Sequence, residues 1–165
     1  MKKYEFTGET KEIRLLFRTA TLHRIRATVA FGIVEVGDLG GWIEKEENLS
    51  HEGKAWVCGD AKVCGDAEVW GNAEVWGNAE VFSASHVLVI GAIGSRNDFT
   101  TFYRDKDNEI TVKCGCFLGK IDRFLEKVTQ THGDSKYALV YRAAVEVAKL
   151  QIDLSGEAPK DADEE

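Results

Sequence analysis

The chain has 165 residues, of which 44% are hydrophobic and 30% charged, so it can bury one or two small cores. The formal net charge is −7, and residues 155–165 carry −4 of it, which leaves −3 for the rest. A chain without a basic field is not expected to bind nucleic acid in general, although a local basic pocket can still hold a small anion. No apolar run follows Met1-Lys2-Lys3, and no stretch approaches the roughly 18 apolar residues of a membrane span, so neither a signal peptide nor a span is expected.

The four cysteines are Cys58, Cys64, Cys114 and Cys116, and their spacing does not resemble a secreted disulfide framework. We therefore expect reduced thiols and a cytoplasmic protein. Cys114 and Cys116 could supply half of a metal site, but no second pair stands at a suitable spacing. Neither a metal nor a cofactor is predicted.

Residues 4–36 are predicted to be β structure. Ile13-Arg14-Leu15 and Leu22-His23-Arg24-Ile25 are short mixed runs on either side of Thr19-Ala20-Thr21, as in a hairpin. Such a hairpin is expected to cover the open end of the repeat that follows, since an uncovered end exposes unpaired backbone groups.

A repeat of six residues follows from Ala55, and it reads AWVCGD, AKVCGD, AEVWGN, AEVWGN and AEVFSA. The alanine and the valine two places later point to the same side of a short strand. Glycine followed by Asp or Asn suits a tight corner. Three such units predict a triangular coil in which residues 18 apart stack, so that Lys62 lies under Glu80 and Val57 under Val75.

This repeat resembles the hexapeptide-repeat proteins of the left-handed β-helix superfamily over residues 43–88. The entry segment, Asp38 to Glu44 followed by Asn48-Leu49-Ser50, resembles a hexapeptide family common among phage and prophage proteins of unknown function. The later segments IGSRND (93–98), FYR (102–104), CGCF (114–117) and THG (131–133) are similar to proteins from the same source. The resemblance implies a mainly β fold with a short left-handed parallel β-helix, and it places the protein in the cytoplasm of a host bacterium.

The remainder is predicted to form a small α+β unit. An apolar strand over 86–93 is followed by strands at 99–104 and 110–114 and by two helices. The inner faces of these helices are expected to carry Ile121, Phe124, Leu125 and Val128, then Tyr137, Val140, Tyr141, Ala144, Val147 and Ala148. The predicted organisation is an N-terminal β cap (1–42), the β-helix (43–88), an α+β domain (89–154) and a disordered acidic tail (155–165).

The loop from Gly94 to Asp98 is the first candidate site. Gly94 frees the backbone, Ser95 and Asn97 offer short polar groups, and the Arg96 guanidinium presents donors suited to phosphate or carboxylate. The alternative is a turn in which Asn97 and Asp98 satisfy local backbone groups.

Three residues outside the loop complete the predicted site. His132 ends a helix, where it either caps the last carbonyls or faces a ligand. Arg104 and Phe117 are expected to join the same pocket. The predicted ligand-binding set is Ser95, Arg96, Asn97, Asp98, Arg104, Phe117 and His132, and no residue is assigned a catalytic role.

An aromatic column occupies the repeat position after the valine. We expect Trp70, Trp76 and Phe82 to form the contact of a homodimer or homotrimer, since two coils bury little on their own. The alternative is that the terminal segments of the same chain cover these rings.

Three functions compete at this point. The phage resemblance implies a non-catalytic anti-defence protein that sequesters a small anionic, nucleotide-type immune signal of the host. A hexapeptide acyltransferase is an alternative in which His51 or His86 would act between subunits, although the repeat is short and no loop interrupts it. A structural module that binds or inhibits another protein is the third. No nucleophile–base pair is visible in the sequence, which favours binding without catalysis.

Overall fold

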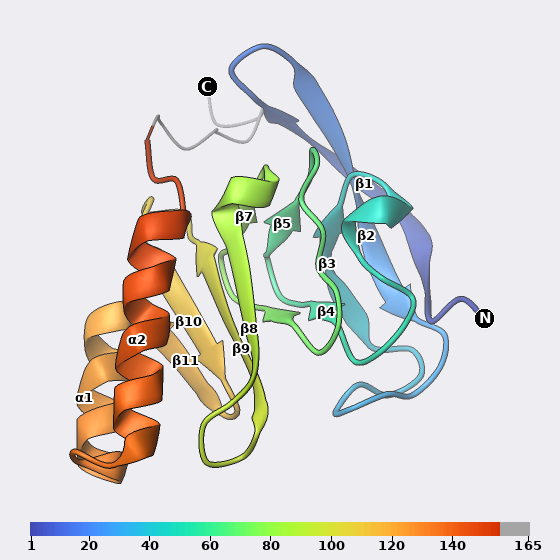
Figure 1. The fold of residues 1–165 in the computed structure, drawn as a ribbon. Coiled ribbons are helices and arrows are strands. Elements are labelled where there is room, and N and C mark those ends of the chain that lie inside the picture. Colours follow the sequence, from blue (N-terminus) through green and yellow to red (C-terminus); the bar gives the residue numbers. More distant parts are fainter. Residues whose placement is uncertain (156–165) are drawn as a thin grey trace.

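The structure is a computed structural model that describes residues 1–155 (Figure 1). The predicted acidic tail lies outside the described residues except for Ser155. The strands of the N-terminal part and the repeat are β1 (Tyr4–Arg14), β2 (Thr19–Ala27), β3 (Leu39–Ile43), β4 (Trp56–Val57), β5 (Lys62–Val63), β6 (Glu74–Val75) and β7 (Glu80–Val81). The C-terminal elements are β8 (Val87–Ile93), β9 (Asp98–Arg104), β10 (Ile110–Cys114), β11 (Phe117–Lys120), α1 (Ile121–His132) and α2 (Lys136–Gln151).

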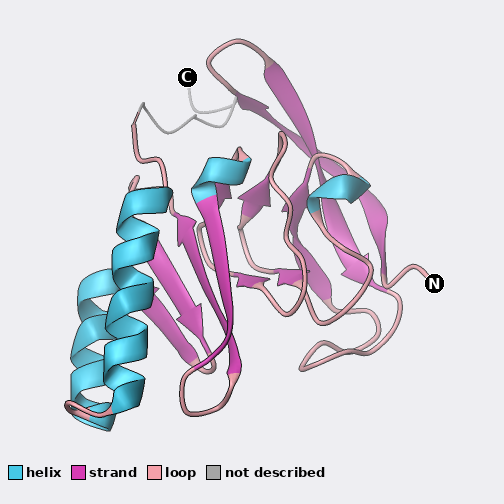
Figure 2. Ribbon diagram, viewed as in Figure 1, coloured by secondary structure: helices cyan, strands magenta, loops and turns pink. Residues whose placement is uncertain are grey.

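These strands form three sheets. One sheet has five strands in the order β1-β2-β3-β5-β7, one has four in the order β11-β10-β9-β8, and β4 pairs with β6 alone. The two helices pack together on the four-stranded sheet, at the side away from the repeat (Figure 2). Two short 3-10 turns, Glu46–Asn48 and Ala84–His86, lie at the two ends of the repeat.

The prediction of a left-handed parallel β-helix as the fold class is wrong. Antiparallel pairing joins β1 to β2 and β2 to β3, and it builds the whole four-stranded sheet. Among the described residues, parallel pairing comprises two-residue ladders between β3 and β5, β5 and β7, and β4 and β6, together with one isolated bridge between Leu49 and Val69. In a unit of six residues most positions belong to the turn and at most two to a strand. The fold class is therefore determined by the longer strands before and after the repeat. The fold consists of mixed and antiparallel sheets with two C-terminal helices.

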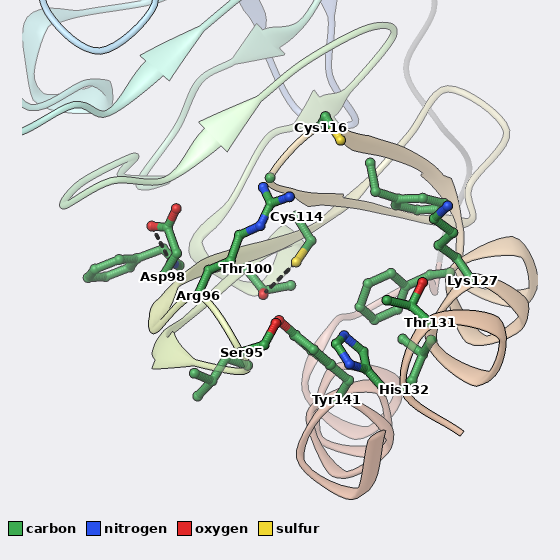
Figure 3. A pocket seen from close by; sticks show the side chains of 16 residues that line it. Ser95, Arg96, Asp98, Thr100, Cys114, Cys116, Lys127, Thr131, His132 and Tyr141 are labelled. Carbon is green, nitrogen blue, oxygen red and sulfur yellow. Dashed lines mark hydrogen bonds between the residues drawn. The ribbon is translucent and has the colours of Figure 1, made fainter. Parts of the chain in front are cut away.

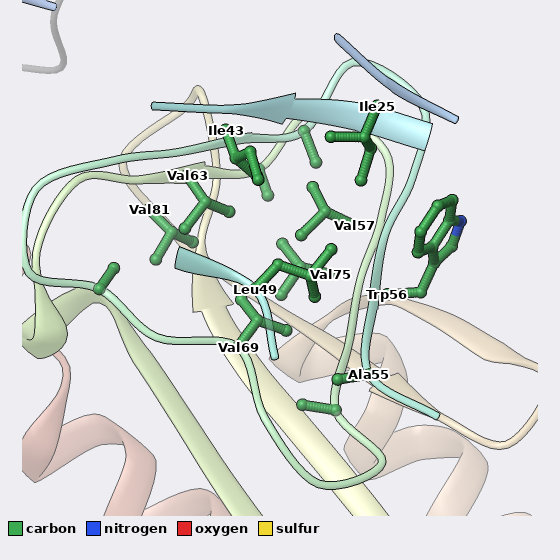
Figure 4. Close-up of a cluster of buried hydrophobic side chains, with 14 of the residues drawn as sticks. Ile25, Ile43, Leu49, Ala55, Trp56, Val57, Val63, Val69, Val75 and Val81 are labelled. Carbon is green, nitrogen blue, oxygen red and sulfur yellow. The ribbon is translucent and has the colours of Figure 1, made fainter. Parts of the chain in front are cut away.

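The spacing within the repeat is observed as predicted. Lys62 pairs with Glu80 and Val57 pairs with Val75, each 18 residues apart. The inward side chains form one core (Figure 4), in which the repeat alanines and valines are at most 1% exposed. Burial at this level leaves no water to compensate a polar side chain.

The N-terminal hairpin of β1 and β2 packs against the first coil. The Tyr4 hydroxyl donates to the carbonyl of Leu49 at 2.8 Å, and the Lys3 ammonium donates to the carbonyl of Ala55 at 2.6 Å. Ile25 of β2 is fully buried in the repeat core. The hairpin therefore supplies donors to carbonyls of the coil as well as apolar cover.

The four-stranded sheet is the middle layer of the molecule. Because side chains alternate along a strand, Thr101 and Tyr103 of β9 face the repeat while Phe102 packs against the helices. The Tyr103 hydroxyl donates to the carbonyl of Trp76 at 3.0 Å, and Thr101 Oγ1 accepts the amide of Glu74 at 3.1 Å. The sheet thus provides hydrogen-bond partners to backbone groups of the last coil.

The first helix face was predicted correctly and the second only in part. Phe124 and Val128 of α1 are buried. On α2 the inner face includes Tyr141, Ala144 and Ala148 as predicted, but Val147 is 47% exposed. Ala138 and Val145 are buried but were not predicted on the inner face, whereas Tyr137 was predicted there and is exposed. Apolar residues lie on both sides of α2, so periodicity alone does not select the inner face.

Val69→Asp is expected to abolish soluble folding. The Val69 side chain is fully buried in the repeat core, and an unpaired carboxylate there costs on the order of 5 kcal/mol. Trp70→Asp is the matched control, since the neighbouring Trp70 is 53% exposed. Thermal unfolding followed by circular dichroism is the measurement, and a cooperatively melting Val69→Asp protein would contradict the assignment of this core.

Candidate functional site

A pocket of about 190 Å³ lies at one end of the middle sheet (Figure 3). The turn between β8 and β9 and the turn between β10 and β11 both reach this end. One face of α1, from Phe124 to His132, and Tyr141 of α2 close the other side. Four segments that are distant in the sequence therefore build the site. Its polar lining comprises Ser95, Arg96, Asp98, Thr100, Cys114, Cys116, Lys127, Thr131, His132 and Tyr141.

A series of aromatic rings forms the wall on the helix side. The Phe117 and Phe124 ring centroids are 5.4 Å apart, and Phe124 meets Tyr141 edge to face at 5.7 Å. The His132 ring stacks on Tyr141 at 5.7 Å. Rings in these arrangements favour further contact with a planar, apolar group.

Two cations stand at the rim of the pocket. Figure 3 shows Arg96 on the hairpin side and Lys127 on the α1 side. Within residues 1–155 neither side chain has a hydrogen bond or an ion pair. Asp98 is the one carboxylate that lines the pocket, and its Oδ1 accepts the amide of Phe99 at 2.7 Å. The rim therefore carries a net positive charge, and the N–H groups of Arg96 and Lys127 are free to donate to a ligand.

Tyr141 anchors the start of the loop. Gly94 has a φ of +77°, and a Cβ at this position would lie 1.8 Å from the Tyr141 hydroxyl oxygen. The hydroxyl also meets the side chains of Cys114 and Ser95. Burial and the Cys114 thiol raise the pKa of Tyr141, so the hydroxyl keeps its proton and can act as a donor in the pocket.

The structure brings five of the seven predicted ligand-binding residues together. These are Ser95, Arg96, Asp98, Phe117 and His132. Asn97 does not line the pocket: its φ is +50°, and its amide donates to the carbonyl of Gly94 at 3.2 Å. Asn97 is thus a backbone turn residue, and of the alternative for this loop the structure shows the Asp98 part, since the Asp98 Oδ1 accepts the amide of Phe99.

Arg104 lies away from the pocket, at the opposite end of β9. It is 3% exposed, its Nε donates to the carbonyl of Glu80 at 3.0 Å, and its guanidinium lies over the Phe82 ring. Arg104 is six positions along β9 from Asp98, a span of about 20 Å. Arg104 therefore supports the last coil of the repeat.

Lys127 and Tyr141 are pocket residues that the sequence reasoning did not assign. Lys127 and Thr131 lie four residues apart on α1, beside the buried face that holds Phe124 and Val128. Two polar residues four positions apart, at the border of an apolar helix face, could have indicated in the sequence that α1 contributes to a site.

Two of the three aromatic residues predicted to contact another subunit are partly covered by other segments of the chain. The Trp76 ring lies under the Lys113 ammonium at 5.1 Å, and Phe82 packs beside a cluster that includes Trp42. Trp70 remains 53% exposed. The covering of Trp76 and Phe82 by other segments of the chain was the alternative for this column.

The two histidines nearest the repeat have structural partners. The Nδ1 of His51 accepts the amide of Lys3 at 3.2 Å, and the Nδ1 of His86 accepts the amide of Phe82 at 3.1 Å. Burial lowers the pKa of His86 to about 4, so its imidazole is neutral near pH 7. Neither histidine lines the pocket.

The cysteines are free thiols, and the part of the chain that the structure describes has no group of three or more His, Cys, Asp or Glu side chains placed to hold a metal. Neither α1 nor α2 combines the length and the apolar character that a bilayer span requires. No protein-family model and no curated protein matches this sequence. The case for a function therefore depends on the pocket.

Gly94→Ala is expected to destabilise the protein by about 3 kcal/mol or more, because the new methyl group would overlap Tyr141. Gly77→Ala is the matched control: Gly77 has a φ of +69° and open space around it, so it tests backbone strain alone, about 1 kcal/mol. Urea unfolding of the two variants provides the comparison. Equal losses of stability would show that Tyr141 does not constrain the loop.

Proposed function

We propose that the protein binds a small anionic ligand with a planar ring, of the nucleotide type, in this pocket. The observation that carries the proposal is the pair of unpaired cations, Arg96 and Lys127, at the rim of a pocket with an aromatic wall. Guanidinium and ammonium groups recognise phosphate, and aromatic rings recognise a base.

The residues divide the recognition between them. Arg96 offers a fork of donors to phosphate oxygens, and the Ser95 hydroxyl from the same loop offers another donor. Phe117 and His132 present rings to the planar group, and the Tyr141 hydroxyl can donate to an acceptor on it. Lys127 adds charge from the opposite side of the rim.

The size of the pocket sets how much of a ligand it can hold. About 190 Å³ is less than the roughly 300–1,000 Å³ of sites for drug-sized ligands. One ring system fits inside, with its anionic group at the rim beside Arg96.

Binding without turnover is the mode that the residues favour. The Cys114 Sγ accepts a hydrogen bond from the Thr100 hydroxyl at 3.4 Å, and no hydrogen bond among the described residues joins it to a histidine or a carboxylate. No described hydrogen bond joins Ser95 or Cys116 to a histidine or a carboxylate, as an activated nucleophile requires. Sequestration of a host immune signal in the bacterial cytoplasm is the specific role proposed, and it depends on the phage resemblance of the sequence.

Arg96→Ala and Lys127→Ala are expected to weaken binding of a nucleoside monophosphate. The loss of one charge-assisted hydrogen bond corresponds to about 2 kcal/mol, or about 30-fold in Kd. The melting temperature should be nearly unchanged, because neither side chain has a partner within residues 1–155. Isothermal titration calorimetry and thermal unfolding provide the two readouts.

Arg123→Ala is the matched control. Arg123 lies one turn before Lys127 on α1 and is also exposed, but it does not line the pocket. Its loss removes the same formal charge and should leave the affinity unchanged. An equal effect of Arg123→Ala and Lys127→Ala, or unfolding of Arg96→Ala without any anion binding to the wild type, would contradict the proposal.

A further inference from the structure

A second hollow, of about 590 Å³, lies on the other face of the middle sheet. It separates the repeat and the loop after β2 from the strands β10 and β11. Trp56 and Trp76 line it from the repeat, Ile33 from the loop and Leu118 from β11. We call this hollow the tryptophan groove.

The pocket and the tryptophan groove meet at the two hairpin tips. They share Asp98, Phe99, Gly115 and Cys116 as lining residues. Gly115 has no side chain to separate them, and a Cβ there would lie 2.8 Å from Nη1 of Arg96. The guanidinium of the proposed anion site therefore stands where the two hollows join.

The groove is suited to a second ring more than to a second anion. Phe31 and Trp56 meet edge to face at 5.2 Å, and they form an aromatic wall. Lys113 is nearly buried, and its charge is balanced by Glu74 at 3.2 Å. The indole N–H of Trp76 is buried and has no acceptor among the described residues, so an acceptor atom on a bound ring would satisfy it.

We infer that the ligand has two planar ring systems joined by an anionic linker, as in a dinucleotide. The inference rests on the proposed function. One ring occupies the pocket, the linker lies at Arg96, and the second ring occupies the tryptophan groove. This assignment accounts for a pocket too small for a whole ligand and for a cation at the junction of the two hollows.

The test compares the four nucleoside 5′-monophosphates with the four matching 3′,5′-linked dinucleoside monophosphates, titrated into the full chain by calorimetry. Each compound carries one phosphate, a monoester of about −1.5 to −2 charge in the mononucleotides and a diester of about −1 in the dinucleoside monophosphates. Because the diester has the smaller charge, tighter binding of the dinucleoside monophosphate is attributed to its second nucleoside. At least one dinucleoside monophosphate is expected to bind 10-fold or more tightly than its mononucleotide. Its binding should also change the tryptophan fluorescence, since Trp56 and Trp76 line the groove.

A pair of loop variants locates the second ring. Ile33→Ser is expected to remove most of the gain from the second ring without changing the affinity for the mononucleotide. Val36→Ser is the matched control, because Val36 lies in the same loop and is similarly exposed, 67% against 72%, but does not line the groove.

The outcomes separate the inference from the proposed function. Equal affinities for the two classes, with no effect of Ile33→Ser, would overturn the two-ring ligand and leave the pocket as a mononucleotide site. If none of the eight compounds binds, both the two-ring ligand and the proposed nucleotide-binding function are wrong.

An independent observation concerns α2, whose outer face carries an apolar stripe. Leu139, Ala143, Val147 and Leu150 lie at helical spacing on the side away from the core. Leu139 is 61% exposed, Val147 47% and Leu150 89%, so no described segment covers the stripe. An exposed stripe of this kind on a regular helix indicates a contact surface.

We infer that a second copy of the chain covers this stripe through an antiparallel pairing of α2 with α2. The stripe is self-complementary in that arrangement, since Leu139 then lies opposite Leu150 and the small Ala143 opposite the larger Val147. Glu146 and Arg142 lie at the same border of the stripe, where each has an exposed ion pair within the chain, with Lys149 at 3.4 Å and with Asp134 at 3.7 Å. In the antiparallel arrangement Glu146 would face Arg142 of the other copy, and these weak surface pairs can be exchanged for pairs between the copies. Four side chains on one helix form a small interface, so micromolar affinity is expected.

Sedimentation equilibrium from about 1 to 200 µM is the test. The wild type is expected to dimerise, and Leu150→Glu is expected to remain monomeric with an unchanged melting temperature. Leu16→Glu is the matched control, because Leu16 is 88% exposed in the turn between β1 and β2. A monomeric wild type, or a dimer that persists in Leu150→Glu, would overturn the inference.

Discussion

The structure depends on covering the two ends of a very short repeat. Each unit contributes at most two residues to a parallel ladder, and the first and last coils each have a coil on one side only, so their outer backbone groups need partners from elsewhere in the chain. Lys3 and Tyr4 supply donors to the first coil, and Thr101 and Tyr103 supply partners to the last. Tyr4 lies on β1, and Thr101 and Tyr103 lie on β9, so long antiparallel strands on either side of the repeat supply most of these partners.

The four-stranded sheet that covers the last coil also carries the candidate pocket, on the face turned away from the repeat. Alternation along β9 sends Tyr103 toward the repeat and Phe102 toward the helices. The β8–β9 and β10–β11 turns lie at one end of this sheet, and there Arg96 of the first turn and Gly115 of the second come close together. A rigid middle layer with projecting turns is a favourable arrangement for ligand recognition, because the scaffold positions the turns.

The sequence predicted those features whose cause is local. The repeat register could be predicted because each unit of six carries its own strand and corner residues, and the loop from Gly94 to Asp98 was found because a glycine-led polar run follows an apolar strand. The fold class was missed because it depends on how long each ladder becomes in three dimensions. Lys127 and Tyr141 were missed because the pocket joins α1 and α2 to a loop 30 to 45 residues earlier in the chain. Arg104 was wrongly assigned because nearness in sequence does not place two residues at the same end of a strand.

The alternation of β10 has a consequence for how recognition can diversify. Cys114 lines the pocket on the helix side, and its neighbour Lys113 lines the tryptophan groove on the repeat side. Two neighbouring residues of β10 therefore line different hollows. A substitution at one of these two positions therefore changes the lining of one hollow and leaves the lining of the other unchanged, even though the hollows meet at the hairpin tips.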